Sequence, residues 1–101
     1  MDSPTPPIAP FDPAELAQAL ARLPAWQHDP ARAALYRRVV KPDFPAAMAF
    51  MVQVGFAAER LDHHPEWSNV YNRVDIWLTT HDAGGISTRD VALAEIIDSL
   101  T

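Results

Sequence analysis

The sequence predicts an α+β domain in which a four-stranded antiparallel sheet carries helices packed on one face. Helical and strand-like patterns follow one another in the order α-β-β-α-β-β-α, and a short turn separates the two strands of each pair. The chain has 101 residues, of which 49% are hydrophobic and 21% charged, the balance of a globular protein. We therefore expect one folded domain over residues 11–101.

Residues 1–10 are expected to form a flexible, proline-rich tail outside this domain. Five of the ten prolines fall within the first thirteen positions, and proline removes both an amide donor and the helical option. Asp12 followed by Pro13 is typical of a helix start, with a carboxylate at the N-cap and proline at the first helical position. Leucines then recur at helical spacing until Pro24 ends the pattern. These leucines are Leu16, Leu20 and Leu23.

Residues 26–28 and 35–40 are predicted to be a short and a longer strand of a hairpin. The segment between them contains DPAR, a turn sequence, and the second strand is rich in β-branched residues. Asp43 then caps a second helix that runs to about Leu61. Its apolar residues spread around more than one face, and they include Phe44, Phe50, Met51, Val54 and Phe56. A helix of this kind is either sunk in its own core or covered by another chain, and we expect self-association.

The last part of the chain predicts two strands and a helix. Residues 66–70 and 74–80 are strand-like, and the turn between them is centred on Asn72, a residue tolerant of a left-handed backbone. Ser87 caps the final helix, with Asp90 three places on as a variant of the capping box. The apolar stripe of this helix consists of Leu93, Ile96, Ile97 and Leu100.

The four histidines include an adjacent pair, His63 and His64, and the predicted hairpin brings a third to them. A turn centred on Asn72 places His63 opposite His81, whereas a two-residue turn would slip the register by one residue. In both cases the imidazoles end within roughly 5 to 8 Å of each other. Histidines titrate near neutral pH, so this group is suited to giving and taking protons on one small molecule.

Other residues near the histidines have two possible roles each. Pro65 forces an extended backbone on His64, so the adjacent rings point in different directions and should act differently. Glu59 lies four residues before His63, one helical turn away if the helix continues, and could orient an imidazole. Further acidic candidates are Asp62, Asp82 and Asp90. For Asp90, capping alone is about as good an explanation as a catalytic role.

The predicted register also pairs Trp67 with Trp77. We interpret them as a cross-strand packing pair, although the same face could stack a flat heterocycle. A histidine pair at a helix end would ordinarily have a structural or capping role, and only the predicted meeting with His81 favours chemistry. His28 is far from the others in sequence and is expected at the surface.

Several function classes are excluded on composition. The formal net charge is −5, and no basic cluster goes beyond Arg37 and Arg38, so direct nucleic-acid binding is not expected. The longest uncharged apolar stretch, residues 46–58, is too short to span a membrane, and no signal peptide pattern is present, so we expect a cytoplasmic protein. There is no cysteine, and no serine lies in a glycine-flanked nucleophile elbow.

A metal site is the sharpest alternative use of the histidines. Glu59, His63, His64 and His81 are ligand types suited to zinc or iron. Adjacent histidines seldom reach one ion together, however, and neither H-x-H nor H-x-x-x-H spacing occurs. We expect no metal.

These residues give the sequence a close resemblance to the pterin-4a-carbinolamine dehydratases. The family motif has a charged or polar residue four before His-His-Pro, then an aromatic, a histidine and an aspartate. The corresponding residues are Glu59, His63, His64, Pro65, Tyr71, His81 and Asp90. The likeness extends through the LDHHPEW and THDAGGIS segments and covers about ninety residues.

The resemblance implies a fold, an activity and a site. The fold has the element order given above, and dimers or tetramers form through sheet edges and the middle helix. The activity is dehydration of a 4a-hydroxytetrahydropterin to the quinonoid dihydropterin, with no metal or cofactor. The implied catalytic residues are His63, His64 and His81, and those implied to line the pterin site with them are Asp62, Thr79, Thr80 and Asp82. Which histidine is acid and which is base is not assigned.

Two other functions remain open at this point. Some members of the family also act as dimerisation partners of a transcription factor, through the helix surface that otherwise makes the tetramer. The same fold could also act on a related pterin, for example in molybdenum-cofactor metabolism. A pure adaptor has no physical need to hold three titratable rings together, so the histidines favour an enzyme.

Overall fold

The structure, a computed structural model, describes residues 8–101 and has the predicted element order. The predicted tail, residues 1–10, therefore lies mostly outside the described residues, and residues 8–10 carry no helix or strand. The elements are α1 (Pro13–Arg22), β1 (Gln27–Asp29), β2 (Ala34–Val40), α2 (Phe44–Leu61), β3 (Glu66–Val70), β4 (Arg73–Leu78), the 3₁₀ turn η1 (His81–Ala83) and α3 (Thr88–Leu100).

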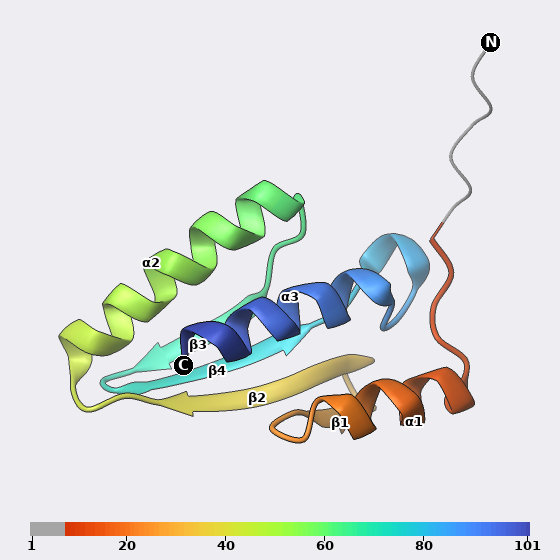
Figure 1. The fold of residues 1–101 in the computed structure, drawn as a ribbon, viewed down its shortest axis with the longest axis horizontal. Coiled ribbons are helices and arrows are strands. Elements are labelled where there is room, and N and C mark those ends of the chain that lie inside the picture. The colour runs from red at the N-terminus through yellow and green to blue at the C-terminus, as the bar shows by residue number, and fades with distance from the viewer. Residues whose placement is uncertain (1–7) are drawn as a thin grey trace, which may run out of the picture.

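The four strands form one antiparallel sheet in the order β1-β2-β4-β3. Figure 1 shows α2 and α3 side by side over one face of this sheet, and α1 lies near its β1 and β2 end. Because β2 and β4 are adjacent in the middle of the sheet, Leu35 lies opposite Leu78 and Val39 opposite Val74. The predicted fold class is confirmed.

The predicted helix starts are also confirmed. Asp12 and Glu15 form a reciprocal capping box at α1, and the Asp43 side chain accepts from the amide of Ala46 at 2.9 Å. At α3, Ser87 and Asp90 form the second capping box. These side chains satisfy amide donors that the first helical turn leaves without partners.

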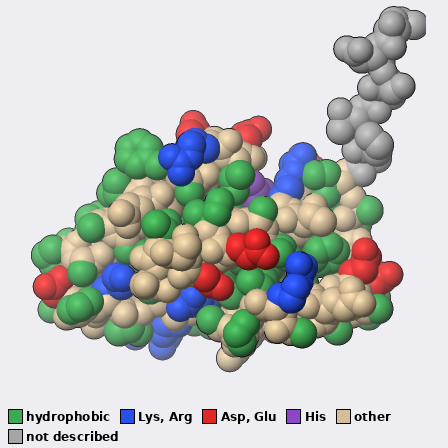
Figure 2. Space-filling view, viewed as in Figure 1, with side chains coloured by type: hydrophobic (Ala, Val, Ile, Leu, Met, Phe, Trp, Pro, Cys, Tyr) green, Lys and Arg blue, Asp and Glu red, His purple; other side chains and the backbone are tan. Residues whose placement is uncertain are grey.

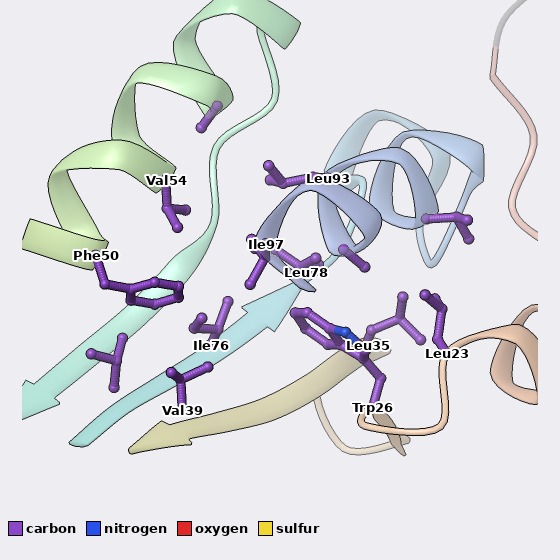
Figure 3. Close-up of a cluster of buried hydrophobic side chains, with 14 of the residues drawn as sticks. Leu23, Trp26, Leu35, Val39, Phe50, Val54, Ile76, Leu78, Leu93 and Ile97 are labelled. Atoms are coloured by element: carbon purple, nitrogen blue, oxygen red, sulfur yellow. The ribbon is translucent and has the colours of Figure 1, made fainter. Parts of the chain in front are cut away.

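The core lies between the sheet and the helices. Figure 3 shows Leu35, Val39, Ile76 and Leu78 rising from the central strands toward side chains of both long helices. The residues that meet them are Phe50 and Val54 from α2, Leu93 and Ile97 from α3, and Leu23 and Trp26 from the N-terminal part. Because α1 contributes to the same cluster, one core holds the domain together. None of the helices described in residues 8–101 is long and apolar enough to cross a membrane.

The β3–β4 hairpin has the two-residue turn that was the alternative, so the register centred on Asn72 is wrong by one residue. Val70 lies opposite Arg73, so the turn has only two residues, and Trp67 lies opposite Ile76 rather than Trp77. The left-handed backbone falls on Tyr71, with a φ of 50°, and not on Asn72. Asn72 is instead held by the residue that follows β2, because its side-chain amide donates to the carbonyl of Lys41 at 2.9 Å.

This slip moves the tryptophans to opposite faces of the sheet, since side chains alternate along a strand. Trp67 packs against the core. Trp77 is on the face without helices, where its ring centroid lies 5.2 Å from that of Tyr36. The predicted Trp67–Trp77 pair therefore does not exist. His63 and His64 precede β3, so neither pairs across the hairpin with His81 or Thr80.

Helix α2 is apolar on most sides, as predicted, but only one side is covered. Its buried side is mostly small, with Ala47, Ala57 and Ala58 beside Phe50 and Val54. On the outside, large apolar side chains recur every four residues, and Figure 2 shows hydrophobic side chains standing out along this helix. We call this set the α2 stripe; it consists of Phe44, Met48, Val52 and Phe56, which are 42%, 42%, 51% and 67% exposed.

Candidate active site

A cavity of about 240 Å³ lies where α2 ends, β4 ends and α3 begins. It is lined by Asp62, His63, His64, Thr79, Thr80, His81, Asp82 and Arg89. All seven residues that the resemblance implies for the pterin site therefore surround one space. Figure 2 shows a histidine side chain recessed between the end of α2 and the loop before α3. This volume suits a small heterocycle rather than a large ligand.

A Schellman turn at the end of α2 places His63. Asp62 adopts a left-handed backbone with a φ of 50° and a ψ of 42°, which aspartate tolerates better than most residues. The amide of Asp62 donates to Glu59 O at 3.1 Å, and the amide of His63 donates to Ala58 O at 3.0 Å. These bonds end the helix and turn the His63 side chain inward, toward α3.

His63 is buried against Asp90. Its Nε2 lies 2.6 Å from Oδ1 of Asp90, and the two residues are 8% and 0% exposed. The other oxygen of Asp90 accepts from the Thr80 hydroxyl at 2.8 Å and from the Ser87 amide at 2.9 Å. Asp90 therefore has both of its predicted roles at once, as a helix cap and as a partner of a candidate catalytic histidine.

Two hydroxyls complete this buried network. Thr80 Oγ1 lies 2.6 Å from Ser87 Oγ, and Ser87 Oγ accepts from the amide of Arg89 at 3.2 Å. Since Thr80 donates to Asp90, Ser87 must donate to Thr80, so every hydroxyl has a donor and an acceptor role. A buried network that is fully satisfied in this way fixes its members in one arrangement.

His64 takes the carboxylate that the sequence assigned to His63. Its Nε2 lies 2.8 Å from Oε1 of Glu59. Glu59 thus bonds to the imidazole of His64 rather than to that of His63, because the helix ends at Leu61 and His63 turns away from it. The two side chains are 58% and 76% exposed, so this pair is held less firmly than His63 and Asp90.

His81 is presented by a closed loop. Thr80 and Gly85 bond to each other through both amides, at 3.0 and 3.2 Å, and Gly84 takes the positive φ of 76° that closes the turn. His81 Nε2 then lies 2.8 Å from Oε1 of Glu66. Glu66 was not among the predicted site residues, since a glutamate that starts a strand is usually only a solvated side chain.

All three rings use the same nitrogen toward a carboxylate. An ionised carboxylate can only accept, so Nε2 of each neutral ring carries the proton and Nδ1 is left as the acceptor. The same arrangement lets a charged ring donate from Nδ1. The cavity is thus lined by three imidazoles, and the second nitrogen of each ring makes no hydrogen bond within residues 8–101.

The remaining lining residues differ in how far they are engaged. The Thr79 hydroxyl donates to Ala33 O at 2.8 Å, which ties the end of β4 to the β1–β2 turn. Asp62 and Asp82 are exposed. Arg89 was missed by the sequence analysis, and its exposed guanidinium makes no hydrogen bond or ion pair within residues 8–101. A cation in the first turn of a helix is unfavourable for the helix dipole, which favours a role toward a ligand.

The opposite face of the sheet has its own buried carboxylate, Asp75. Arg38 bonds to it at 2.8 Å, and this holds the pKa of Asp75 below its ordinary value. The Tyr36 hydroxyl donates to Asp75 at 2.6 Å, which raises the pKa of Tyr36. This cluster is remote from the histidine cavity and explains part of the stability of the sheet.

Two other hollows are larger but lack titratable rings. One, of about 450 Å³, lies between α2 and α3, and the other, of about 620 Å³, lies beside α1. Neither is lined by a histidine. Within residues 8–101, no group of three histidine, aspartate or glutamate side chains is arranged to hold a metal ion. His28 is exposed and lies in β1, outside the cavity.

A cavity with three histidine–carboxylate pairs, built on this α+β fold, defines a protein equipped for proton transfer on a small molecule. The model of the family Pterin 4 alpha carbinolamine dehydratase matches residues 9–100. The chain belongs to the pterin-4a-carbinolamine dehydratase family.

Individual relatives agree with this assignment. A protein of Rhizorhabdus wittichii with the provisional name pterin-4-alpha-carbinolamine dehydratase is 59% identical over 93 residues, which cover 92% of this chain and 96% of the relative. One of Rhodospirillum rubrum with the same provisional name is 52% identical, over 88% of this chain and 92% of its own. The crystal structure of a transcriptional coactivator/pterin dehydratase from Brucella melitensis superimposes with a TM-score of 0.87 at 40% identity, covering 90% of this chain and 97% of the other.

Proposed function

We propose that the protein dehydrates 4a-hydroxytetrahydropterins to quinonoid dihydropterins and so returns an oxidised pterin to the pool of reducible cofactor. The observation that carries this proposal is the set of three imidazoles around one cavity, each with its own carboxylate. Family membership supplies the substrate class.

The reaction requires two proton transfers. A protonated imidazole gives its Nδ1 proton to the 4a-hydroxyl, the bond between C4a and oxygen breaks, and water leaves. The electron pair of N5 forms the new double bond to C4a, and a neutral imidazole accepts the N5 proton at its Nδ1. The two rings end with exchanged protonation states, which solvent resets. Each well-placed transfer is typically worth about 10²- to 10⁴-fold in rate.

The three histidines are unequal candidates for these roles. His63 is buried and rigid, and its Asp90 partner cannot move without breaking the Thr80 and Ser87 bonds. His64 and His81 are exposed at the mouth of the cavity and can exchange protons with water. We therefore assign a proton transfer with the substrate to His63. We assign the exchange of protons with solvent to His64 and His81.

The pterin ring needs groups that hold its polar edge. Arg89 offers guanidinium donors to the 4-oxo group, and a fixed planar fork of donors suits a flat acceptor edge. The carboxylates of Asp62 and Asp82 can accept from the ring amine and amide. Asp62, Asp82 and Arg89 are all exposed, and they form no ion pair with one another within residues 8–101. All three charges are therefore available to the substrate.

We also propose that the protein forms homo-oligomers, dimers or tetramers, through the α2 stripe. Isolated apolar residues are normal on a protein surface, but the four large apolar side chains of the α2 stripe lie together on one helix face. Burying the stripe against a second copy would stabilise both copies. Among residues 8–101 the edge strand β3 has a neighbour on one side only, so it offers a second contact between sheets.

A protein-binding role is the second candidate. The α2 stripe that favours self-association would equally fit an amphipathic helix of another protein. The similar protein from Brucella melitensis is named both a transcriptional coactivator and a pterin dehydratase. Activity on a different pterin is a third candidate. The residues that line the cavity define how the pterin ring is held more closely than they define how its side chain is held.

One assay tests the proposed dehydration, and its failure would leave the protein-binding role. Mixing the protein with 4a-hydroxytetrahydropterin and following quinonoid product by absorbance tests the enzyme directly. An enzyme accelerates product formation above the spontaneous rate, whereas an adaptor leaves that rate unchanged. Comparing pterins with different side chains at C6 tests the choice of substrate.

A further inference from the structure

We propose that Glu66, supported by Arg32 and Trp77, is a positioning residue that holds the ring of His81 toward the substrate. This inference rests on the proposed dehydration. It adds a residue outside the family motif and outside the cavity lining, on the strand that borders the site.

His81 needs such support because little else restrains it. Its side chain is 81% exposed at the start of the loop that follows β4. Within residues 8–101, the imidazole has one hydrogen-bond partner, Oε1 of Glu66 at 2.8 Å. A ring without that bond would move among several rotamers, and only some of them present Nδ1 to the cavity.

Glu66 can orient the ring of His81 because another residue restrains its own carboxylate. Its second oxygen, Oε2, lies 3.5 Å from Nη2 of Arg32. The Arg32 guanidinium in turn lies 3.9 Å above the ring of Trp77, and Trp77 donates from Nε1 to Asp29 at 3.1 Å. One oxygen of Glu66 thus faces His81, and the other faces an arginine that is stacked on Trp77.

The observed register makes this arrangement possible. Glu66 lies directly opposite Trp77, so both side chains point to the helix-free side at the end of the sheet where β4 leads into His81. With the register expected from the sequence, Trp77 would have lain opposite Trp67. Glu66 would then not have lain opposite the tryptophan on which Arg32 stacks.

The comparison with the other two pairs shows what Glu66 supplies. His63 is oriented by a fully buried aspartate with two further donors. Glu59, the partner of His64, has no third group within the described residues. Glu66 has one, so the unit Arg32–Glu66–His81 follows the general pattern in which a third group orients the partner of a proton-transfer residue.

The expected effect is moderate because the pair is partly exposed. Surface ion pairs restrain their members by a few fold at most, and exclusion of water by a bound pterin would strengthen this pair somewhat. We expect Glu66→Gln to lower kcat about three- to tenfold while KM changes less than twofold. Arg32→Gln should lower kcat in the same direction by about twofold.

A double-mutant cycle tests the inference, because a positioning residue matters only while its target is present. Glu66→Gln is measured in the wild type, in His81→Ala and in His64→Ala, with Glu95→Gln, an exposed residue of α3, as the control that should change nothing. The expected result is a full effect in the His64→Ala background and none in the His81→Ala background. Equal effects in both backgrounds, or wild-type kcat in folded Glu66→Gln, would overturn the proposal.

Two safeguards keep the outcomes distinct. If Glu66→Gln lowers the melting temperature appreciably, the same cycle with Arg32→Gln decides, since Arg32 is 44% exposed and does not touch the cavity. If the wild-type protein does not accelerate dehydration at all, the proposed function has failed. An active wild type with additive Glu66 effects would instead contradict the positioning role alone.

Discussion

His63 and Asp90 are 27 residues apart in the chain, yet Nε2 of His63 lies 2.6 Å from Oδ1 of Asp90 in the interior of the protein. The pair joins the end of α2 to the first turn of α3, so it belongs to the fold and to the cavity at the same time. A buried carboxylate is costly unless it is fully bonded, and here three donors converge on it. Stability and chemistry should therefore depend on the same residue.

Asp90→Asn should destabilise the protein by about 2–4 kcal/mol and also reduce activity. The amide has one accepting oxygen, so it cannot serve His63, Thr80 and Ser87 together, and a buried group is left without a partner. Urea unfolding followed by tryptophan fluorescence measures the loss. Asp82→Asn, an exposed change of the same kind, should shift the free energy of unfolding by less than about 0.5 kcal/mol. Equal stability of the two variants would contradict the network.

His63→Ala and His81→Ala should each lower the dehydration rate at least tenfold and leave the fold intact, because each removes one proton-transfer group. His28→Ala is the matched control, since His28 is exposed and outside the cavity. Stopped-flow rates together with circular dichroism check the prediction. A folded His63→Ala protein with the wild-type rate would remove that residue from the mechanism.

Acid should weaken the cluster around Asp75. Its pKa in the folded protein is lowered, chiefly by the bond from Arg38, so its contribution to stability is present above about pH 4, the ordinary range of aspartate, and is lost as pH falls through the lowered value. The difference in urea midpoint between wild type and Arg38→Gln should be largest near neutral pH and should fall toward zero in acid. Arg22→Gln, at an exposed position on α1, should show a small difference that is independent of pH. A difference between wild type and Arg38→Gln that stays constant from pH 7 to pH 3 would argue against the pairing.

A charge on the α2 stripe should break the proposed homo-oligomer. Val52→Glu or Phe56→Glu would place a carboxylate in an interface that excludes water, and this costs several kcal/mol unless the charge is paired. Sedimentation velocity should show a shift from an oligomer to a monomer, whereas Ala92→Glu on the exposed side of α3 should leave the size unchanged. A monomeric wild type, or a Val52→Glu oligomer of wild-type size, would show that the stripe has another use.

Patterns local in sequence predicted the fold well. The N-caps Asp12, Asp43 and Ser87 act within one helical turn, so their effect can be recognised from neighbouring residues alone. Alternation of apolar residues likewise located β3 and β4 to within two residues. The fold class followed from these elements and from their order.

The predictions that failed concerned alternative conformations that the local sequence leaves nearly equal in free energy. Turns of two and three residues both fit the segment around Asn72, and the choice between them is set partly by the Asn72 bond to Lys41, which belongs to another strand connection. The slip of one residue then changed the neighbours of Trp77 and placed Glu66 opposite it. Glu59 and His63 looked like a helical pair, but the left-handed turn at Asp62 sent His63 to Asp90 instead.

The most direct measurement is the rate of quinonoid dihydropterin formation after rapid mixing with 4a-hydroxytetrahydropterin, with and without a metal chelator. Wild-type protein should exceed the spontaneous rate by at least a hundredfold, about the lower bound for one well-placed proton transfer. The chelator should have no effect, and the double variant His63→Ala/His81→Ala should return the rate close to the spontaneous value. A folded wild-type protein that leaves the spontaneous rate unchanged would contradict the proposed chemistry of the cavity.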